Sequence, residues 1–198
     1  MSRRKVSNPL ALAVLACLAE GPMHPYEIAS TLRQRHKDVS IKLNYGSLYS
    51  VIDALARNAM VAPKETVRQG KRPERTIYEL TAAGHHELTD WLSELLARPV
   101  KEYTAFEAGL SLMPVLPPKT ALALLEQRID SLETEIASMR TIEEHARKRS
   151  LPRLFIVERE YQIMLREAEL AWVRGLAADI ADGRLDGLDQ WQNWHLTK

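Results

Sequence analysis

The sequence predicts a mainly α-helical protein with one small β-hairpin, and three observations lead to this prediction. Apolar residues recur at intervals of three and four along most of the 198 residues, as they do on helices packed against a core. Residues 64–80 instead hold two short β-like runs joined by a loop with Gly and Pro. After Pro99 the pattern changes again, so we expect two domains, residues 1–98 and 99–198.

Three helices are expected before the hairpin. Asn8 and Pro9 supply a cap and a first helical residue for a helix that ends before Gly-Pro. A second helix is expected over residues 25–36, with Tyr26 among the residues on its inner side. A nine-residue polar connection leads to a third helix, over about residues 45–58.

A fourth helix follows the hairpin, because apolar residues return to helical spacing between residues 81 and 99. Helix, helix, helix, hairpin, helix is the order of a winged helix-turn-helix domain. The sequence therefore predicts such a domain in residues 1–98, followed by a helical domain with no second hairpin.

The charge and cysteine content restrict the environment and the partners. Net charge is +1 overall, but residues 1–90 carry 13 basic against 9 acidic residues and residues 91–198 carry 14 against 17. A polyanion is therefore expected to meet the first half. Cys17 is the single cysteine and lies in an apolar run, so it is expected to be a buried, unreactive side chain of a protein in a reducing compartment. That run is shorter than the about 20 residues that cross a membrane, and we expect a soluble, cytoplasmic protein.

The third helix begins with residues that are poor helix formers. Its apolar residues from Leu48 to Leu55 fall within an arc of about 100°, the buried face expected of a packed helix. The opposite face of its opening is small and rich in hydroxyl groups, which suits a helix that enters the major groove of DNA. The candidate DNA-binding residues here are Lys42, Asn44, Tyr45, Gly46, Ser47, Tyr49 and Ser50. The alternative is that Ser, Gly and Asn merely cap the helix.

The hairpin loop supplies positive charge. Arg68, Lys71, Arg72 and Arg75 lie on or beside it, a short distance after the third helix. A wing with these residues could follow the phosphates or enter the minor groove, where arginine is favoured. A basic loop is by itself more often just solvated, but its position after three helices favours a DNA contact.

Three motifs in this order resemble the PadR-type transcriptional regulators. They are MHPYEIASTL at residues 23–32, NYGSLYSVIDALARNAMV at 44–61 and GKRPERTIYELTAAG at 70–84. The resemblance implies a homodimeric winged-helix protein that binds a near-palindromic operator in double-stranded DNA, usually as a repressor. In some members a small aromatic or drug-like effector releases the DNA.

The resemblance also assigns positions. It implies that residues 46–49 begin the recognition helix, that Lys71, Arg72 and Arg75 lie on the wing, and that Tyr78 and Leu80 lie on its returning strand. Two residues depart from the family pattern. Ser50 stands where Pro is common, which could change operator preference, and Asn58 stands where Gly is common, although Asn can also adopt a left-handed helix cap.

The second half contains a heptad repeat, and a dimer reads two operator half-sites where one winged helix reads one. The repeat predicts a dimerisation seam, formed by Leu122, Leu125, Ile129, Leu132, Ile136 and Met139. Its alternative is a helix packed within one chain. Helices near residues 85–96 and 154–181 are expected to complete the interface, with Trp91 and Trp172 as buried anchors.

Catalytic and metal-binding motifs are missing from the sequence. The six histidines form no HExxH motif, and there is no P-loop, GxGxxG or GxSxG. We therefore expect no enzyme activity, no metal and no cofactor. Besides a dimeric DNA-binding repressor, two other classes remain open: a protein-interaction adaptor that binds no DNA, and a helical protein that handles a small molecule.

Overall fold

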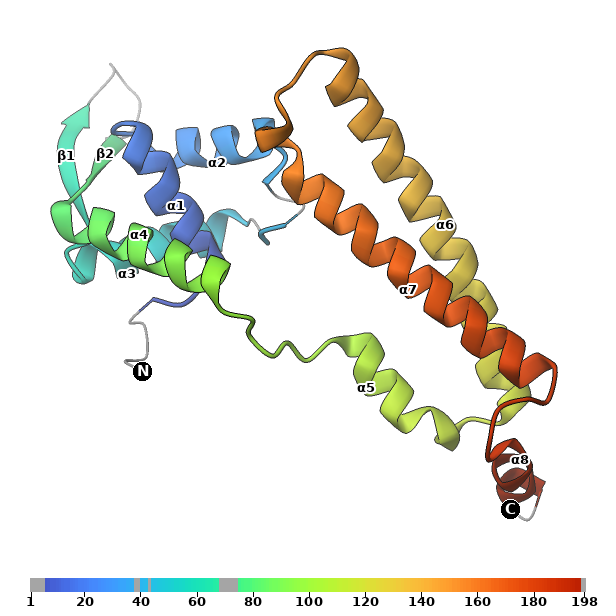
Figure 1. Cartoon of the computed structure of the whole chain (residues 1–198). Coiled ribbons are helices and arrows are strands. Elements are labelled where there is room, and N and C mark those ends of the chain that lie inside the picture. Colours follow the sequence, from blue (N-terminus) through green and yellow to red (C-terminus); the bar gives the residue numbers. More distant parts are fainter. Residues whose placement is uncertain (1–5, 38–39, 43, 68–74, 197–198) are drawn as a thin grey trace. The chain divides into compact units, whose positions relative to one another are not determined.

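The computed structural model describes residues 6–37, 40–42, 44–67 and 75–196, without the side chains at positions 45, 66, 67 and 75 (Figure 1). The chain divides into two compact units, Met1–Lys101 and Glu102–Lys198. Helices dominate both units, and the strands among the described residues form one antiparallel hairpin, so the predicted fold class is confirmed. No helix in the described part of the chain has the length and apolar character needed to span a membrane.

The first unit packs three further helices and the hairpin around its first helix. In chain order its elements are α1 (Pro9–Glu20), α2 (Pro25–Gln34), α3 (Tyr45–Arg57), β1 (Val61–Val67), β2 (Arg75–Leu80) and α4 (Ala82–Ala97). The side chain of Asn8 accepts a hydrogen bond from the amide of Leu10 at 2.9 Å, and Pro9 occupies the first helical position, as expected. Seven of the 12 residues of α1 are buried, because α2, α3, α4 and β2 all contact it.

The segment before α2 adds a third strand position to the hairpin. β1 and β2 are antiparallel, with Val61 opposite Leu80 and an irregularity between Pro63 and Glu65. Met23 pairs with Tyr78, and each amide donates to the other residue's carbonyl at 3.0 Å. The next residue, His24, caps α2. The MHPYE motif and the strand motif are therefore in direct contact in the folded chain.

Two local predictions need correction. Tyr26 does not lie on the inner side of α2, because its position in the first turn points outward and leaves it 60% exposed. Asn58 does not adopt the left-handed conformation, since its φ is −95° and its side-chain amide donates to the carbonyl of Ala54 at 2.8 Å. The left-handed residue is the next one, Ala59, with φ of 55°.

Thr81 and Gly84 join α4 to the end of α3. The hydroxyl of Thr81 accepts a hydrogen bond from the amide of Gly84 at 3.0 Å and lies 2.7 Å from the carbonyl oxygen of Ala59. A β-carbon on Gly84 would stand 2.0 Å from the carbonyl oxygen of Met60. The Thr-x-x-Gly spacing is therefore a structural requirement of this junction, and only glycine fits at its last position.

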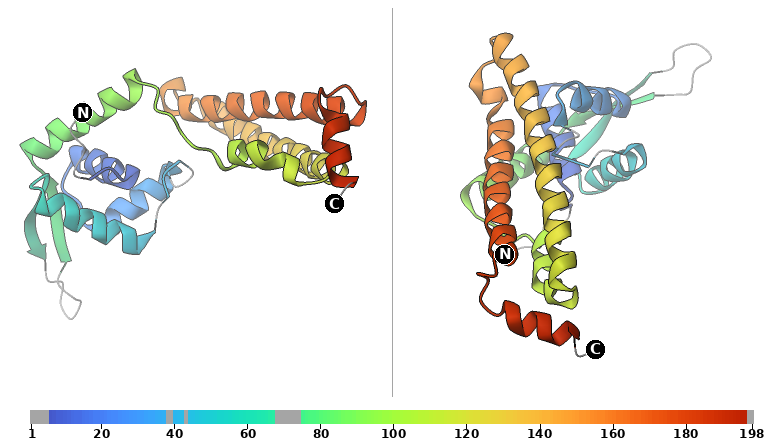
Figure 2. Two further views of the ribbon diagram at one scale, coloured as in Figure 1. Left: turned by 90° about the horizontal axis from the view of Figure 1, so that it is seen from below. Right: turned by 90° about the vertical axis from the view of Figure 1, so that its right-hand side faces the viewer.

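The second unit is built on a long antiparallel helical hairpin (Figure 2). Its elements are α5 (Ala105–Leu112), the 3-10 helix η2 (Met113–Val115), α6 (Pro118–Lys148), the 3-10 helix η3 (Arg153–Phe155), α7 (Val157–Ala181) and α8 (Leu188–Leu196). α6 and α7 contact each other along their length. α8 is tied to the segment before α6, because the indole nitrogen of Trp191 donates to the carbonyl of Leu116 at 2.8 Å.

The heptad residues of α6 pack against α7 of the same chain. Leu125 lies in a cluster with Val173 and Ala177, and Leu132 and Ile136 lie in a second cluster with Ile163 and Leu170. Met139 is buried in the second cluster, and Leu122 and Ile129 are partly buried against the clusters. The structure thus uses this seam inside one chain, as in the alternative left open by the sequence.

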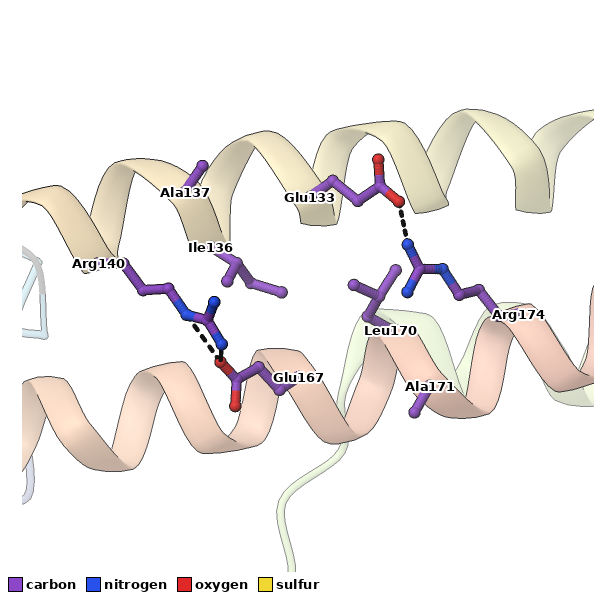
Figure 3. A pocket seen from close by; sticks show the side chains of 8 residues that line it. All are labelled: Glu133, Ile136, Ala137, Arg140, Glu167, Leu170, Ala171 and Arg174. Carbon is purple, nitrogen blue, oxygen red and sulfur yellow. Dashed lines mark hydrogen bonds and ion pairs between the residues drawn. The ribbon is translucent and has the colours of Figure 1, made fainter.

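Two matching segments align α6 with α7. ETEIASMR at residues 133–140 and EAELAWVR at 167–174 place Glu, Ala and Arg at the same spacing on each helix. Because the helices are antiparallel, Arg140 pairs with Glu167 and Arg174 pairs with Glu133 (Figure 3). The two alanines widen the space between these ion pairs into an open groove of about 390 Å³. Such exposed pairs add little stability, so their main effect is to specify register.

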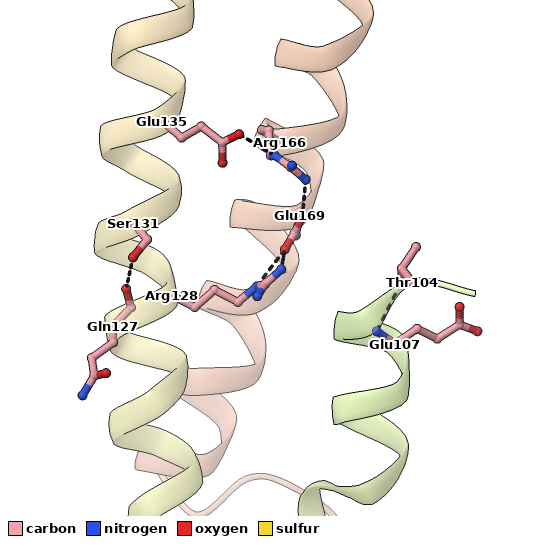
Figure 4. A network of polar contacts seen from close by, with 8 residues as sticks. All are labelled: Thr104, Glu107, Gln127, Arg128, Ser131, Glu135, Arg166 and Glu169. Atoms are coloured by element: carbon pink, nitrogen blue, oxygen red, sulfur yellow. Dashed lines mark hydrogen bonds and ion pairs between the residues drawn. The ribbon is translucent and has the colours of Figure 1, made fainter. Parts of the chain in front are cut away.

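A chain of charged groups links the other side of the two helices (Figure 4). Glu169 binds Arg128 with an Nε–Oε1 distance of 2.7 Å and Arg166 with an Nη1–Oε2 distance of 3.2 Å. The guanidinium of Arg128 also lies 3.6 Å from the ring centroid of Phe106 in α5. This cation–π contact attaches α5 to the hairpin.

Candidate nucleic-acid interface

The candidate interface is centred on α3, which has one buried and one exposed face. Leu48, Val51, Ile52 and Leu55 are between 0% and 7% exposed, so the predicted apolar face is confirmed as part of the core. These four side chains fix the rotation of α3 in the first unit. The opposite face is consequently presented to solvent from its first turn onward.

Hydrogen bonds organise the first turn of α3. The side-chain oxygen of Asn44 accepts from the amide of Ser47 at 2.6 Å, which makes Asn44 the cap of the helix. Gly46 is exposed, and a β-carbon there would meet only the Asn44 side chain, at 3.8 Å. The hydroxyl of Ser50 donates to the carbonyl of Gly46 at 3.0 Å, so its proton is already engaged within the helix.

The exposed face combines one aromatic side chain with charges of both signs. Tyr49 is 49% exposed, and Lys42 is exposed just before the helix. Asp53 lies one turn after Tyr49 and is also exposed. Its carboxylate repels phosphate but can accept a hydrogen bond from the exocyclic amine of cytosine. Asp53 is not among the candidate DNA-binding residues predicted from the sequence.

Tyr78 of β2 borders the same face. Burial raises the pKa of its phenol above the usual value, and the charges of Asp53 and Tyr49 raise it further. The phenol is therefore neutral at physiological pH and can act as a hydrogen-bond donor beside α3.

The predicted wing residues lie at the limit of the described structure. Arg68, Lys71 and Arg72 fall outside the described residues. Arg75 begins β2 opposite Val67, but its side chain is not among those described, and the same holds for the side chain of Tyr45 in α3. β1 and β2 thus bring the two ends of the basic loop together.

The sequence prediction placed Tyr26 in the core and so did not count it among the residues that could bind DNA. Tyr26 stands exposed at the first turn of α2, and Pro25 at the first helical position is the signal that could have located it there. The first helix of a helix-turn-helix pair crosses the DNA backbone. An exposed phenol at this position is therefore a candidate phosphate contact.

The predicted interface anchors of the second half have different environments. Trp91 is 5% exposed and packs inside the core of the first unit, while Trp172 on α7 is 53% exposed. One edge of Trp172 meets Phe106, with ring centroids 6.4 Å apart. Of the two, only Trp172 offers surface to another molecule. Among the described residues, no group of three or more His, Cys, Asp or Glu side chains could hold a metal ion.

Comparison with known families identifies the first unit. The model of the transcriptional regulator PadR-like family matches residues 14–90, which include α2, α3, the hairpin and the Thr81–Gly84 junction. Residues 14–90 of this chain are thus similar to the PadR-like family. The resemblance carried by the three sequence motifs is thereby confirmed. No curated protein matched the sequence.

Several solved structures share the fold over both units. Bacillus subtilis PadR in complex with operator DNA has 20% sequence identity and a TM-score of 0.66, covering 87% of this chain and 99% of that one. The same protein in complex with p-coumaric acid has 18% identity and a TM-score of 0.67, covering 87% and 98%. The Vibrio cholerae virulence activator AphA has 16% identity and a TM-score of 0.65, covering 87% and 98%. At these identities the similarity concerns the fold.

Proposed function

We propose that this PadR-like regulator binds a near-palindromic operator in double-stranded DNA as a homodimer and represses the adjacent gene. The observation that carries the proposal is the two-sided α3. Its apolar face is fully buried, and its exposed opening is small, capped and hydroxyl-bearing. A helix of this kind can approach base edges in a major groove about 12 Å wide.

Ser47, Tyr49 and Ser50 are proposed to contact base edges or nearby phosphates, and Gly46 to let the backbone approach closely. Lys42, Asn44 and Tyr45 extend the contact at the amino end of α3, where the helix dipole favours phosphate. On the wing, Arg68, Lys71, Arg72 and Arg75 are proposed to bind phosphates or the minor groove. The basic charge of residues 1–90 supports this assignment.

The homodimer supplies the second half-site. Because the heptad side chains of α6 are used against α7, the dimer that we propose needs further surface on the helical hairpin. We also propose that a small aromatic or drug-like molecule releases the DNA. The complex of B. subtilis PadR with p-coumaric acid supports this part, since the two chains share a fold.

The test is a footprint on the DNA upstream of the protein's own gene, combined with in vitro transcription. We expect a protected site with two related halves one helical turn, about 34–36 Å, apart. Added protein should lower transcription, and some member of a panel of aromatic acids and planar drugs should restore it. Raised transcription would reverse the proposed direction of regulation. A stable complex with another protein, without protection of any DNA, would identify an adaptor instead.

A further inference from the structure

The exposed residues of α3 form one narrow face, and Asp53 lies within it. An α-helix turns by about 100° per residue, and the residues of α3 whose side chains are described and exposed fall within an arc of about 100°. They are Gly46, Tyr49, Ser50, Asp53 and Arg57. In rotation about the helix axis, Asp53 lies between Tyr49 and Ser50. A surface that meets these two hydroxyl groups therefore also faces the carboxylate of Asp53.

The carboxylate of Asp53 has no ion-pair partner among the described residues. Arg57 lies one turn later, at a spacing that allows an ion pair on a helix, but these two side chains do not form one. Tyr78 of β2 is close enough to feel the charge, since burial first and then the charge of Asp53 raise the pKa of its phenol. Asp53 is thus an exposed charge beside the hairpin that no cation of the described structure neutralises.

A carboxylate discriminates between bases because it only accepts hydrogen bonds. In the major groove guanine presents the acceptors N7 and O6, thymine presents the acceptor O4, and adenine presents its amine beside the acceptor N7. Cytosine presents its exocyclic amine, a donor with no acceptor on the same edge of that base. A carboxylate is therefore attracted to cytosine and repelled by the acceptors of the other three bases.

The neighbouring hydroxyl groups do not discriminate in this way. Ser47 and Tyr49 can each donate as well as accept, so they can bond to any base edge. Asp53 is the single acidic residue in the sequence of α3, and its charge also repels the phosphates of every DNA sequence. This repulsion lowers the affinity for duplex DNA in general, and a cytosine amine that meets the carboxylate offsets the loss. Repulsion of incorrect sequences increases specificity.

We propose that Asp53 determines operator specificity by accepting a hydrogen bond from the exocyclic amine of one cytosine in each half-site. The inference rests on the proposed function, because it requires α3 in the major groove, and it adds the base that one residue reads. Asp53 is four residues after Tyr49, about 6 Å along the helix axis at about 1.5 Å per residue. Successive bases are about 3.4 Å apart, so we expect this cytosine about two base pairs from the base beside Tyr49.

The affinities of Asp53→Ala for two duplexes test the proposal. With the full-length chain and fluorescence anisotropy, the dissociation constant for the footprinted operator should rise at least about tenfold, the loss expected for one incorrect base pair. The dissociation constant for a shuffled duplex should fall instead, because a repulsive charge is removed. Opposite changes distinguish a specificity determinant from a structural residue. An equal rise for both duplexes, or no rise for the operator, would overturn the proposal.

Base substitution in the operator identifies the contact. The unmodified chain should require cytosine at one symmetric position of each half-site, where any other base should raise the dissociation constant at least about tenfold. Asp53→Asn should lose this preference and favour adenine at the same position, since the asparagine amide pairs with N6 and N7 of adenine. Preferences at the other positions should not change. A cytosine preference that survives in Asp53→Asn would contradict the contact.

Two variants control for charge and for position on the face. Asp186→Ala removes an exposed acidic residue between α7 and α8, so it should leave both dissociation constants nearly unchanged. Arg57→Ala removes the neighbouring cation of α3 and should weaken binding to operator and shuffled duplex by a similar factor. Thermal melts should show that Asp53→Ala is folded, because alanine is a favourable helix residue. An operator preference reduced as much by Asp186→Ala as by Asp53→Ala would refute the specific role.

The outcomes separate this inference from the proposed function. If Asp53→Ala binds the operator as tightly as the unmodified chain does, the DNA contact of α3 stands and only the role of Asp53 is overturned. If the unmodified full-length chain binds neither duplex, both are overturned.

Discussion

Gly84 and Met60 approach each other so closely that a β-carbon on Gly84 would stand 2.0 Å from the Met60 carbonyl oxygen. Gly84→Ala must therefore shift backbone at the junction of α3, β1 and α4. We expect a loss of about 3 kcal/mol in the free energy of unfolding of the first unit, the upper part of the range for overpacked sites. Urea unfolding followed by circular dichroism measures it.

Gly46→Ala is the control for this substitution. Gly46 also lies in the first turn of a helix in the same unit, but a β-carbon there would make only an ordinary contact, at 3.8 Å. Alanine should raise stability at this position, by up to about 1 kcal/mol. Equal changes in the free energy of unfolding for the two substitutions would show that the Met60 carbonyl does not exclude a β-carbon at position 84.

Ala59 is a second position where the backbone conformation predicts whether a substitution stabilises or destabilises the first unit. Its φ of 55° is unfavourable for a residue with a β-carbon. Ala59→Gly should therefore stabilise the first unit by about 1 kcal/mol, the approximate cost of the left-handed conformation. Ala54→Gly, inside α3, should instead lose about 1 kcal/mol. A lower melting temperature for Ala59→Gly than for the unmodified chain would contradict the left-handed conformation of Ala59.

Ser47 and Ser50 offer a matched pair for the DNA contact. The proton of the Ser50 hydroxyl is engaged by the carbonyl of Gly46, so removing this hydroxyl takes away no free donor. Ser47→Ala should weaken operator binding by about 1–3 kcal/mol, the value of a base contact, and Ser50→Ala by less. Binding to operator and to unrelated DNA, compared by fluorescence anisotropy, tests this order. A larger effect of Ser50→Ala would reverse the assigned roles.

The wing should control affinity for all sequences alike. Lys71→Ala combined with Arg72→Ala removes two cations per chain, and each lost phosphate contact lowers the slope of log K against log salt by about 0.9. We expect the slope to fall by about one to two units per half-site. Lys119→Ala with Arg98→Ala removes the same charge elsewhere and should leave the slope nearly intact. An unaltered slope in the wing variant would remove the wing from the DNA contact.

Cys17 should be protected from thiol reagents. Burial raises the pKa of its thiol from the usual 9.0 to about 11. At pH 8 the folded protein therefore holds roughly 100-fold less thiolate than an exposed cysteine, and the reaction should be slow by at least that factor. The thiol also links stability to pH, because its pKa is higher in the folded chain than in the unfolded chain. The free energy of unfolding is therefore unaffected by this group below pH 9 and declines between pH 9 and 11. Unfolding in urea should restore the ordinary rate, and fast reaction of the native chain at pH 8 would contradict the burial.

The features predicted correctly from the sequence are those that depend on residues close together in the chain. Asn8 and Asn44 cap their helices as expected, and Leu48 faces the core, because caps and helical periodicity are local features. The sequence did not predict the conformation of Ala59 or the need for glycine at position 84. Both depend on how the end of α3 meets α4, which are far apart in the sequence.

The heptad illustrates a second limit. A repeat such as the one through Leu125 and Ile136 shows that an apolar seam exists, but not which helix covers it. The structure covers it with α7 of the same chain.

The proposed function depends most directly on whether the exposed face of α3 and the wing bind duplex DNA. The deciding measurement is the affinity of the full-length protein for the DNA upstream of its own gene, compared with a shuffled duplex of the same composition, at low and at physiological salt. We predict tighter binding to the upstream DNA at both salt concentrations, by at least about 1000-fold at physiological salt, with two chains bound per site. Equal affinity for the two duplexes, or no binding even at low salt, would contradict the account.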